Sequence, residues 1–252
     1  MKKLWLLALL LLSACTETER TNYYDNGQME YIVNLNEDGE RDGREAYYYE
    51  NGQVKLNQNY NNGILEGESV SYYENGQLKI RKKYQNGMLE GEWSSYYENG
   101  QLEALGSFNN ASVENYEGGI PSNNRVGKWN FYHKGGGIKL ETTYVKGQKD
   151  GKELAYHTNG QISNEKNYKY GKLDGTVISY HENGQLKSET KYENGKIIRS
   201  ERSVVYYDNG KVDYEMYWSE EGYKEVKYNK DGSFYRWVTR DKYGKLIDYY
   251  PK

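Results

Sequence analysis

From residue 23 onward, polar and apolar side chains alternate in short runs, and glycines punctuate these runs at regular distances. The clearest example is residues 68–91, ESVSYYENGQLKIRKKYQNGMLEG, in which two alternating runs flank the pair Asn75-Gly76. Alternation with a period of two, enriched in tyrosine and β-branched residues, is typical of a half-buried β-strand. An Asn-Gly pair between two such runs predicts a β-hairpin.

This hairpin recurs along the whole chain. Its turn glycines are separated by 25, 24, 24, 36, 24, 24, 26 and 22 residues, and they are Gly27, Gly52, Gly76, Gly100, Gly136, Gly160, Gly184, Gly210 and Gly232. A second column of glycines marks the connections between hairpins, for example Gly63 and Gly67. A repeat of 20 to 50 residues indicates a stacked array in which each unit packs against its neighbours.

Two registers fit the hairpin of residues 68–91. A two-residue loop places Val70 opposite Arg81. A three-residue loop instead places Val70 opposite Ile80, and it also places Tyr72 opposite Leu78. The second register sorts apolar and polar residues onto separate faces, and we therefore prefer it.

The predicted fold class is all-β: an elongated single-layer antiparallel β-meander of stacked β-hairpins, with one face lined by Tyr, Leu, Ile and Val. We expect residues 23–250 to form an array of about nine units. A loop insertion near residues 109–126 accounts for the one long spacing.

The recurring pattern YYENGQLK followed by Y-x-NG-x-x-x-G resembles the MORN-repeat superfamily in its bacterial variant form. Proteins of this variant are commonly named antitoxin components of the YwqK type. The resemblance covers about residues 23–250. It implies stacked hairpins of the MORN type, and it leaves the function open because these repeats serve as scaffolds in very different proteins.

The N-terminus carries a targeting signal. Two lysines precede an apolar run over residues 4–12, and Leu12-Ser13-Ala14-Cys15 resembles the bacterial lipobox. We therefore expect residues 1–14 to be a lipoprotein signal peptide, Cys15 to be lipidated, and residues 15–22 to be a lipidated tether. The alternative is an ordinary secretory signal with a chance cysteine. The predicted location is the bacterial cell envelope, in a lipid-anchored form, on the outer membrane or cell surface if the cell is Gram-negative.

Composition narrows the function classes. The net charge of −3 argues against a nucleic-acid partner, which would require a basic surface. The single cysteine excludes a disulfide framework and a Cys-rich metal site. We find no catalytic constellation and no cofactor motif, so we expect a protein that is not an enzyme, with no catalytic, cofactor or metal residues.

Several residues nevertheless invite a site hypothesis. His133, His157 and His181 share one repeat position, but successive hairpins lie roughly 10 Å apart, too far for one metal ion. We interpret this position as one that accepts Tyr or His. Residues 36–43 look like a calcium loop, yet they align with the ordinary connection at residues 61–67.

Two other regions could bind a partner. The insertion is either a tolerated loop or a binding loop, and its candidate residues are Tyr116, Asn123, Asn124 and Arg125. The last two units carry Trp218 and Trp237, which either cap the array or contact a partner.

Three functions remain open. The leading one is a non-enzymatic envelope lipoprotein whose repeat ribbon binds an unknown protein partner and reaches the membrane only through the anchor at Cys15. The second is a module that binds cell-wall glycan, which would need an open row of aromatic rings. The third is an antitoxin or immunity protein that neutralises a toxin by direct binding. A signal for export fits poorly with an antitoxin against a cytosolic toxin.

Overall fold

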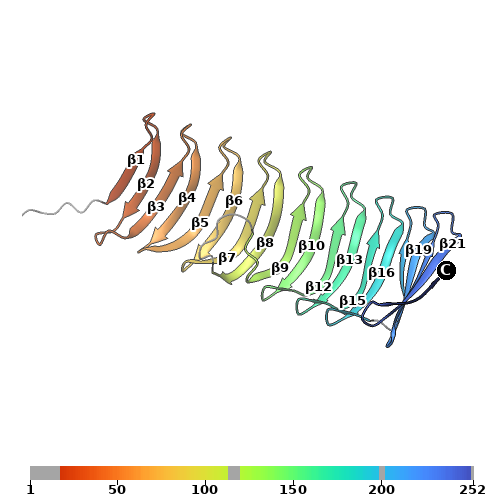
Figure 1. Cartoon of the computed structure of the whole chain (residues 1–252). Helices are drawn as coiled ribbons and strands as arrows, with labels where there is room; N and C mark the ends of the chain where they lie inside the picture. The colour runs from red at the N-terminus through yellow and green to blue at the C-terminus, as the bar shows by residue number, and fades with distance from the viewer. Residues whose placement is uncertain (1–17, 113–119, 199–201, 251–252) are drawn as a thin grey trace, which may run out of the picture.

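A computed structural model describes residues 18–112, 120–198 and 202–250. Within these residues there is no helix, and a single antiparallel sheet of 22 strands is formed by consecutive hairpins (Figure 1). The predicted all-β meander is therefore confirmed. The predicted signal peptide and Cys15 lie outside the described residues. The described part of the chain holds no helix long and apolar enough to cross a membrane.

The strands follow one another along the ribbon in chain order. They are β1 (Glu19–Tyr23), β2 (Met29–Leu35), β3 (Arg41–Tyr48), β4 (Val54–Asn61), β5 (Ile64–Tyr72), β6 (Leu78–Gln85), β7 (Met88–Tyr96), β8 (Leu102–Ala111), β9 (Arg125–Tyr132), β10 (Ile138–Val145), β11 (Gln148–Lys149), β12 (Gly151–Tyr156), β13 (Ile162–Lys169), β14 (Lys172–Leu173), β15 (Gly175–Tyr180), β16 (Leu186–Glu193), β17 (Lys196–Ile197), β18 (Ser203–Tyr206), β19 (Val212–Ser219), β20 (Gly222–Tyr228), β21 (Phe234–Asp241) and β22 (Leu246–Tyr250).

The repeat glycines close the hairpin turns. All nine glycines of the first column have positive φ, as at Gly76 with a φ of 83°. The Gly76 N–H donates to Tyr73 O at 2.9 Å, and the Tyr73 N–H donates to Gln77 O at 2.8 Å. Three residues therefore form the loop between Tyr73 and Gln77. Glycine is favoured at its last position because a side chain is strained in this left-handed conformation.

The predicted pairing holds next to the turn and is wrong further along the strands. Tyr72 stands opposite Leu78, as expected, but Val70 stands opposite Arg81 rather than Ile80. A β-bulge after Leu78 inserts one extra residue and shifts the register by one. The same shift recurs in the other hairpins, for instance between Tyr47 and Tyr48.

The bulge also changes which side chains share a face. Val70 and the neighbouring Ser69 are both buried although they point to opposite faces of the sheet. Ile80 stands opposite Ser71, so Ile80 and Val70 point to opposite faces of the sheet, and the expectation that both line one apolar face is wrong. The extra lysine of the bulge covers the turn tyrosine, since Lys79 Nζ lies 5.4 Å from the centre of the Tyr73 ring.

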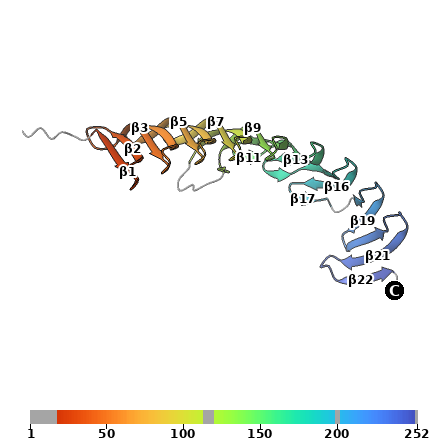
Figure 2. The ribbon, with the colours of Figure 1, turned by 90° about the horizontal axis from the view of Figure 1, so that it is seen from above.

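The main apolar core sits in the middle of the ribbon, on the face that carries Trp93. The ring centre of Trp129 lies 5.7 Å from that of Trp93 and 5.1 Å from that of Phe108. Tyr84, Leu89, Ala104, Ala111 and Tyr144 complete this cluster, which we call the aromatic cluster. Seen from above, the ribbon bends away towards β19–β22 at its C-terminal end (Figure 2).

Candidate functional site

Each hairpin turn is tied to the next repeat by two side chains. Tyr73 Oη donates to Tyr96 O at 2.8 Å, and Asn75 Nδ2 donates to Glu98 O at 3.0 Å. Tyrosine makes the first bond in the repeats of Tyr24, Tyr49, Tyr97 and Tyr207, and asparagine makes the second in those of Asn26, Asn51, Asn99, Asn159, Asn183 and Asn209. We call these two rows of bonds the turn ladder.

The three histidines occupy tyrosine positions of the turn ladder. Nε2 lies 3.1 Å from a carbonyl oxygen of the next repeat for His133, 3.0 Å for His157 and 2.8 Å for His181. A carbonyl oxygen only accepts, so Nε2 carries the proton in each ring. Within residues 18–112, 120–198 and 202–250, no three His, Cys, Asp or Glu side chains gather closely enough to hold a metal ion.

A second row of polar contacts runs along one face of the sheet. Glu141 accepts from Lys128 Nζ at 2.8 Å and from Tyr156 Oη at 3.1 Å. Glu165 repeats the arrangement one unit later, with Lys152 and Tyr180. The Lys128 hydrogen bond is the main reason that the pKa of Glu141 is lowered, although partial burial opposes it. Burial, followed by the bond to Glu141, raises the pKa of Tyr156.

The carboxylates of Glu45 and Glu153 are almost fully buried on the other face of the sheet from Glu141 and Glu165. Glu153 pairs with Lys149 and with Lys166 Nζ at 3.5 Å. Glu45 pairs with Arg41 Nε at 3.2 Å. Each carboxylate thus has a cationic partner, as a buried charge requires, and it is engaged in an ion pair within the sheet.

The loop that looks like a calcium site is held by its own hydrogen bonds. Asn36 Oδ1 accepts from the backbone N–H groups of Asp38 and Glu40, at 3.1 and 2.9 Å. The side-chain oxygen expected to bind a cation is therefore committed to the turn, in keeping with the ordinary connection that we expect here.

The described part of the insertion folds back onto the aromatic cluster. Arg125 Nε donates to Pro121 O at 2.7 Å, its Nη2 donates to Ile120 O at 3.0 Å, and its guanidinium lies 4.8 Å from the Trp129 ring centre. Asn123 and Asn124 donate to backbone carbonyls inside the same segment. The candidate binding residues Asn123, Asn124 and Arg125 thus stabilise the insertion itself, while Tyr116 lies outside the described residues.

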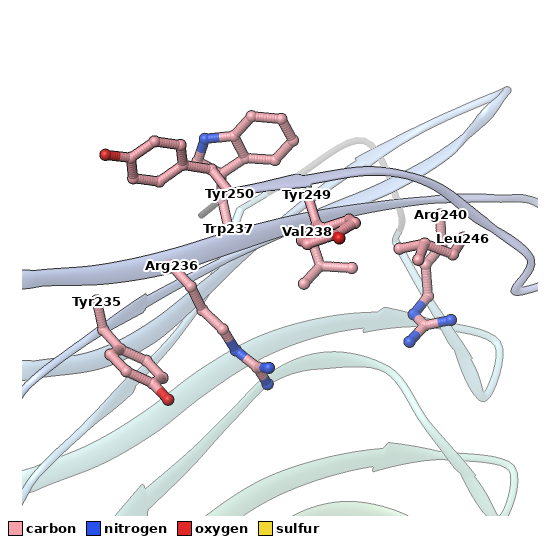
Figure 3. A pocket seen from close by; sticks show the side chains of 8 residues that line it. All are labelled: Tyr235, Arg236, Trp237, Val238, Arg240, Leu246, Tyr249 and Tyr250. Carbon is pink, nitrogen blue, oxygen red and sulfur yellow. The ribbon is translucent and has the colours of Figure 1, made fainter. Parts of the chain in front are cut away.

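At the C-terminal end, a cleft of about 380 Å³ opens beside β21 and β22. Figure 3 shows Trp237 and Tyr250 on one side of the ribbon and Tyr235, Arg236 and Val238 on the other. The cleft is also lined by Arg240, Leu246 and Tyr249. Trp237 is thus half-buried at a cleft, where the Lys224 ammonium lies 4.8 Å from its ring centre.

Trp218 is placed differently. Its ring packs against Tyr223 with ring centres 5.0 Å apart, and it is half-buried rather than exposed. Sequence reasoning pointed to both tryptophans but missed the cleft, because the cleft is lined by residues of two strands. Its arginines and Tyr235 stand on β21, whereas Tyr249 and Tyr250 stand on β22. The one available signal was the crowding of Arg and Tyr after residue 234.

Comparisons with known proteins match most of the array. A family model described as MORN repeat variant matches residues 17–37, 41–62, 65–86, 89–110, 149–170, 173–194 and 202–220. No curated protein matches the chain.

Solved structures resemble it only weakly. "Crystal Structure of TcdB2-TccC3" is 11% identical over 91% of this chain and 17% of that one, with a TM-score of 0.21. A structure of the Photorhabdus luminescens Tc holotoxin pore is 12% identical over 91% of this chain and 16% of that one, with a TM-score of 0.20. This chain therefore spans less than a fifth of the solved chains it matches.

Proposed function

Because this chain belongs to the MORN repeat variant family, we propose that it is a non-enzymatic envelope lipoprotein whose repeat ribbon binds another protein. The chain is a repeat scaffold, with each hairpin bonded to the next through the turn ladder. Long repeat ribbons offer extended surfaces for partners.

The observation that carries the non-enzymatic part is the pairing of the charged groups. The carboxylates Glu45, Glu141, Glu153 and Glu165 each contact a lysine or arginine in the same sheet. The histidine Nε2 atoms are likewise committed to backbone carbonyls. A general acid or base needs an available proton or lone pair facing a substrate, and these groups use theirs within the array.

The state of the tyrosines favours a protein partner over a glycan. An aromatic platform for sugar rings needs open ring faces, whereas the turn tyrosines are half-buried and donate to the next repeat. Tyr156 and Tyr180 are likewise bonded to carboxylates. An antitoxin role rests on the resemblance of the repeats alone, and it predicts a neighbouring toxin gene and growth arrest after deletion of this gene.

The envelope part rests on residues 1–14 and Cys15. It is tested by incorporation of labelled palmitate with membrane fractionation, comparing the native chain with Cys15→Ser. We expect label in the membrane fraction for the native chain alone. An unlabelled native chain that stays out of the membrane would contradict the lipoprotein assignment.

The scaffold part is tested by reconstitution. A protein that co-purifies from membrane extracts in fixed proportion should bind again when both components are purified separately. Cleavage or transfer of a substrate by the purified chain, or the absence of any stoichiometric partner, would refute this part.

A further inference from the structure

The two ends of the ribbon carry opposite charge. Residues 222–250 hold seven Lys and Arg against four Asp and Glu, a net charge of +3, although the whole chain has −3. Residues 18–50 hold three Lys and Arg against nine Asp and Glu, a net charge of −6. The C-terminal end is therefore a basic surface on an acidic protein, and it favours an acidic partner.

The same end exposes apolar side chains. Seven of the sixteen large apolar or aromatic side chains that are exposed among the described residues fall in β21, β22 and the turn between them. The exposed fractions are 60% for Ile247, 45% for Tyr249 and 52% for Tyr250. Exposed apolar groups on an unpaired edge strand form a template for another strand, and native proteins usually cover or interrupt such an edge.

The outer edge of β22 carries a backbone N–H group to which an added strand could bond. Among the described residues, β22 pairs with β21 alone, and Tyr249 stands opposite Val238. The Tyr249 N–H donates to Asp248 Oδ1 at 2.9 Å, so this N–H is not used by a backbone carbonyl of β21. The carboxylate of Asp248 thus takes the place that a carbonyl of a neighbouring strand would occupy.

The cleft beside this edge supplies unneutralised positive charge. Arg236 has no carboxylate partner among the described residues, and its Nε is buried without a hydrogen bond. Within the described part of the chain, the Arg240 side chain bonds only to a backbone carbonyl, from Nη1 to Gly244 O at 3.0 Å. A guanidinium that lacks a carboxylate is suited to bind one from a partner, in a two-point contact.

We propose that β22 and the cleft of Arg236 and Arg240 are the docking site for an extended acidic segment of a partner protein, which adds to the sheet as a further antiparallel strand. Main-chain hydrogen bonds along β22 supply affinity, and alternate acidic side chains reach the two arginines. This proposal rests on the proposed protein-binding function and names the surface and the chemistry of its partner.

A second copy of this chain is a poorer occupant. It could offer the acidic strand β1, which also pairs on one side only among the described residues. However, β1 begins four residues after Cys15, so a lipid anchor there would hold this edge against the membrane. A different protein that reaches the far end of the ribbon meets no such obstacle.

The test measures peptide binding by fluorescence anisotropy with the purified full chain in detergent. The probe is a labelled nine-residue peptide that alternates glutamate with valine, and its control alternates lysine with valine. We expect the glutamate peptide to bind at least about tenfold more tightly, with affinity that falls on raising salt because part of the attraction is screened.

Variants separate the edge from the cleft. Tyr249→Pro removes the outward N–H and should weaken binding about tenfold, whereas Thr21→Pro on the opposite edge strand should leave it unchanged. Arg236→Gln should weaken the glutamate peptide about tenfold, with little effect on the lysine peptide. Asp248→Ala removes the competing acceptor and should tighten binding several-fold.

Equal binding of both peptides, or native affinity in both Tyr249→Pro and Arg236→Gln, would overturn the proposal. Arg236→Gln still decides the question if Tyr249→Pro fails to fold. Concentration-dependent dimers that Tyr249→Pro abolishes, without peptide binding, would assign the edge to a second copy and also overturn it. Lipid labelling and a reconstituted partner that persist while peptide binding fails would refute this site and leave the scaffold function standing.

Discussion

The packing of Gly106 against Trp129 gives the sharpest test of the aromatic cluster. A Cβ at Gly106 would lie 2.1 Å from Trp129 Cδ2 and 2.2 Å from its Cε2. The φ of Gly106 lies outside the left-handed region, so Gly106→Ala creates a steric problem and no backbone strain. Trp129 cannot easily yield, because its Nε1 donates to Ser107 O at 3.2 Å and the Arg125 guanidinium covers its ring.

The expected cost follows from overpacking a dense core. Extra methyl groups in well-packed sites cost about 1–3 kcal/mol, and the cost here belongs at the upper end because a ring carbon, rather than a flexible chain end, is met. A loss of about 1–3 kcal/mol raises the equilibrium constant for local unfolding of the affected strands about 5- to 150-fold. Because repeats depend mainly on their neighbours, the loss should be confined to β7–β10.

Hydrogen exchange is the appropriate assay, because a long repeat array need not unfold in one step. Gly106→Ala should speed exchange in β7–β10 and leave β20 and β21 unchanged. Gly135→Ala is the matched control, since its Cβ would meet nothing within 4 Å and its φ is also outside the left-handed region. Equal exchange in the two variants would refute the described contact between Gly106 and Trp129.

Three further changes test the ladder, the face contacts and the insertion. His157→Phe removes the hydrogen bond to Tyr180 O and should destabilise its repeat by about 1 kcal/mol. His157→Tyr should retain the stability of the repeat. Hydrogen exchange of the backbone amides in β12–β16 compares the two variants. Because the pKa of Glu141 is lowered, chiefly by Lys128, this bond stabilises the fold above the ordinary carboxyl pKa of 4.5 and is lost as pH falls through the lowered value. Lys128→Met should therefore flatten the acid dependence of unfolding measured by circular dichroism, and an unchanged profile would contradict this. Arg125→Met should cost on the order of 2–3 kcal/mol and expose residues 120–124 to protease, so an equally resistant variant would argue against the observed anchoring.

The fold could be predicted from the sequence because its decisive residues are local and repeated. A glycine at positive φ, such as Gly76, terminates a turn in a way that few other residues can, and its nine-fold recurrence sets the meander. The position of the bulge could not be predicted. The inserted Lys79 stands between the apolar Leu78 and Ile80, so the alternation of polar and apolar residues continues unbroken and the bulge leaves no mark in the pattern.

The aromatic cluster could not be predicted because it depends on pairing between distant residues. Gly106 looks like a stray glycine outside both columns, and only the space it leaves for Trp129 explains it. The position of Arg125 in an insertion leaves open both a tolerated loop and a binding loop. Its observed role follows from three-dimensional contacts with Pro121 and Trp129, which spacing along the chain does not reveal.

The regularity of the array bears on where a partner can bind specifically. The turn ladder presents the same Tyr or His and Asn groups about every 24 residues, so a partner that contacted only these groups could dock in several equivalent positions. Specificity therefore requires a feature that interrupts the repetition, and the described chain has two, the insertion and the C-terminal hairpin with β22. The described insertion residues Asn123, Asn124 and Arg125 are used in internal bonds. Among residues 202–250, which the structure describes, the outer edge of β22 and the buried Nε of Arg236 are not used in this way, and for that reason we assign recognition to the C-terminal end.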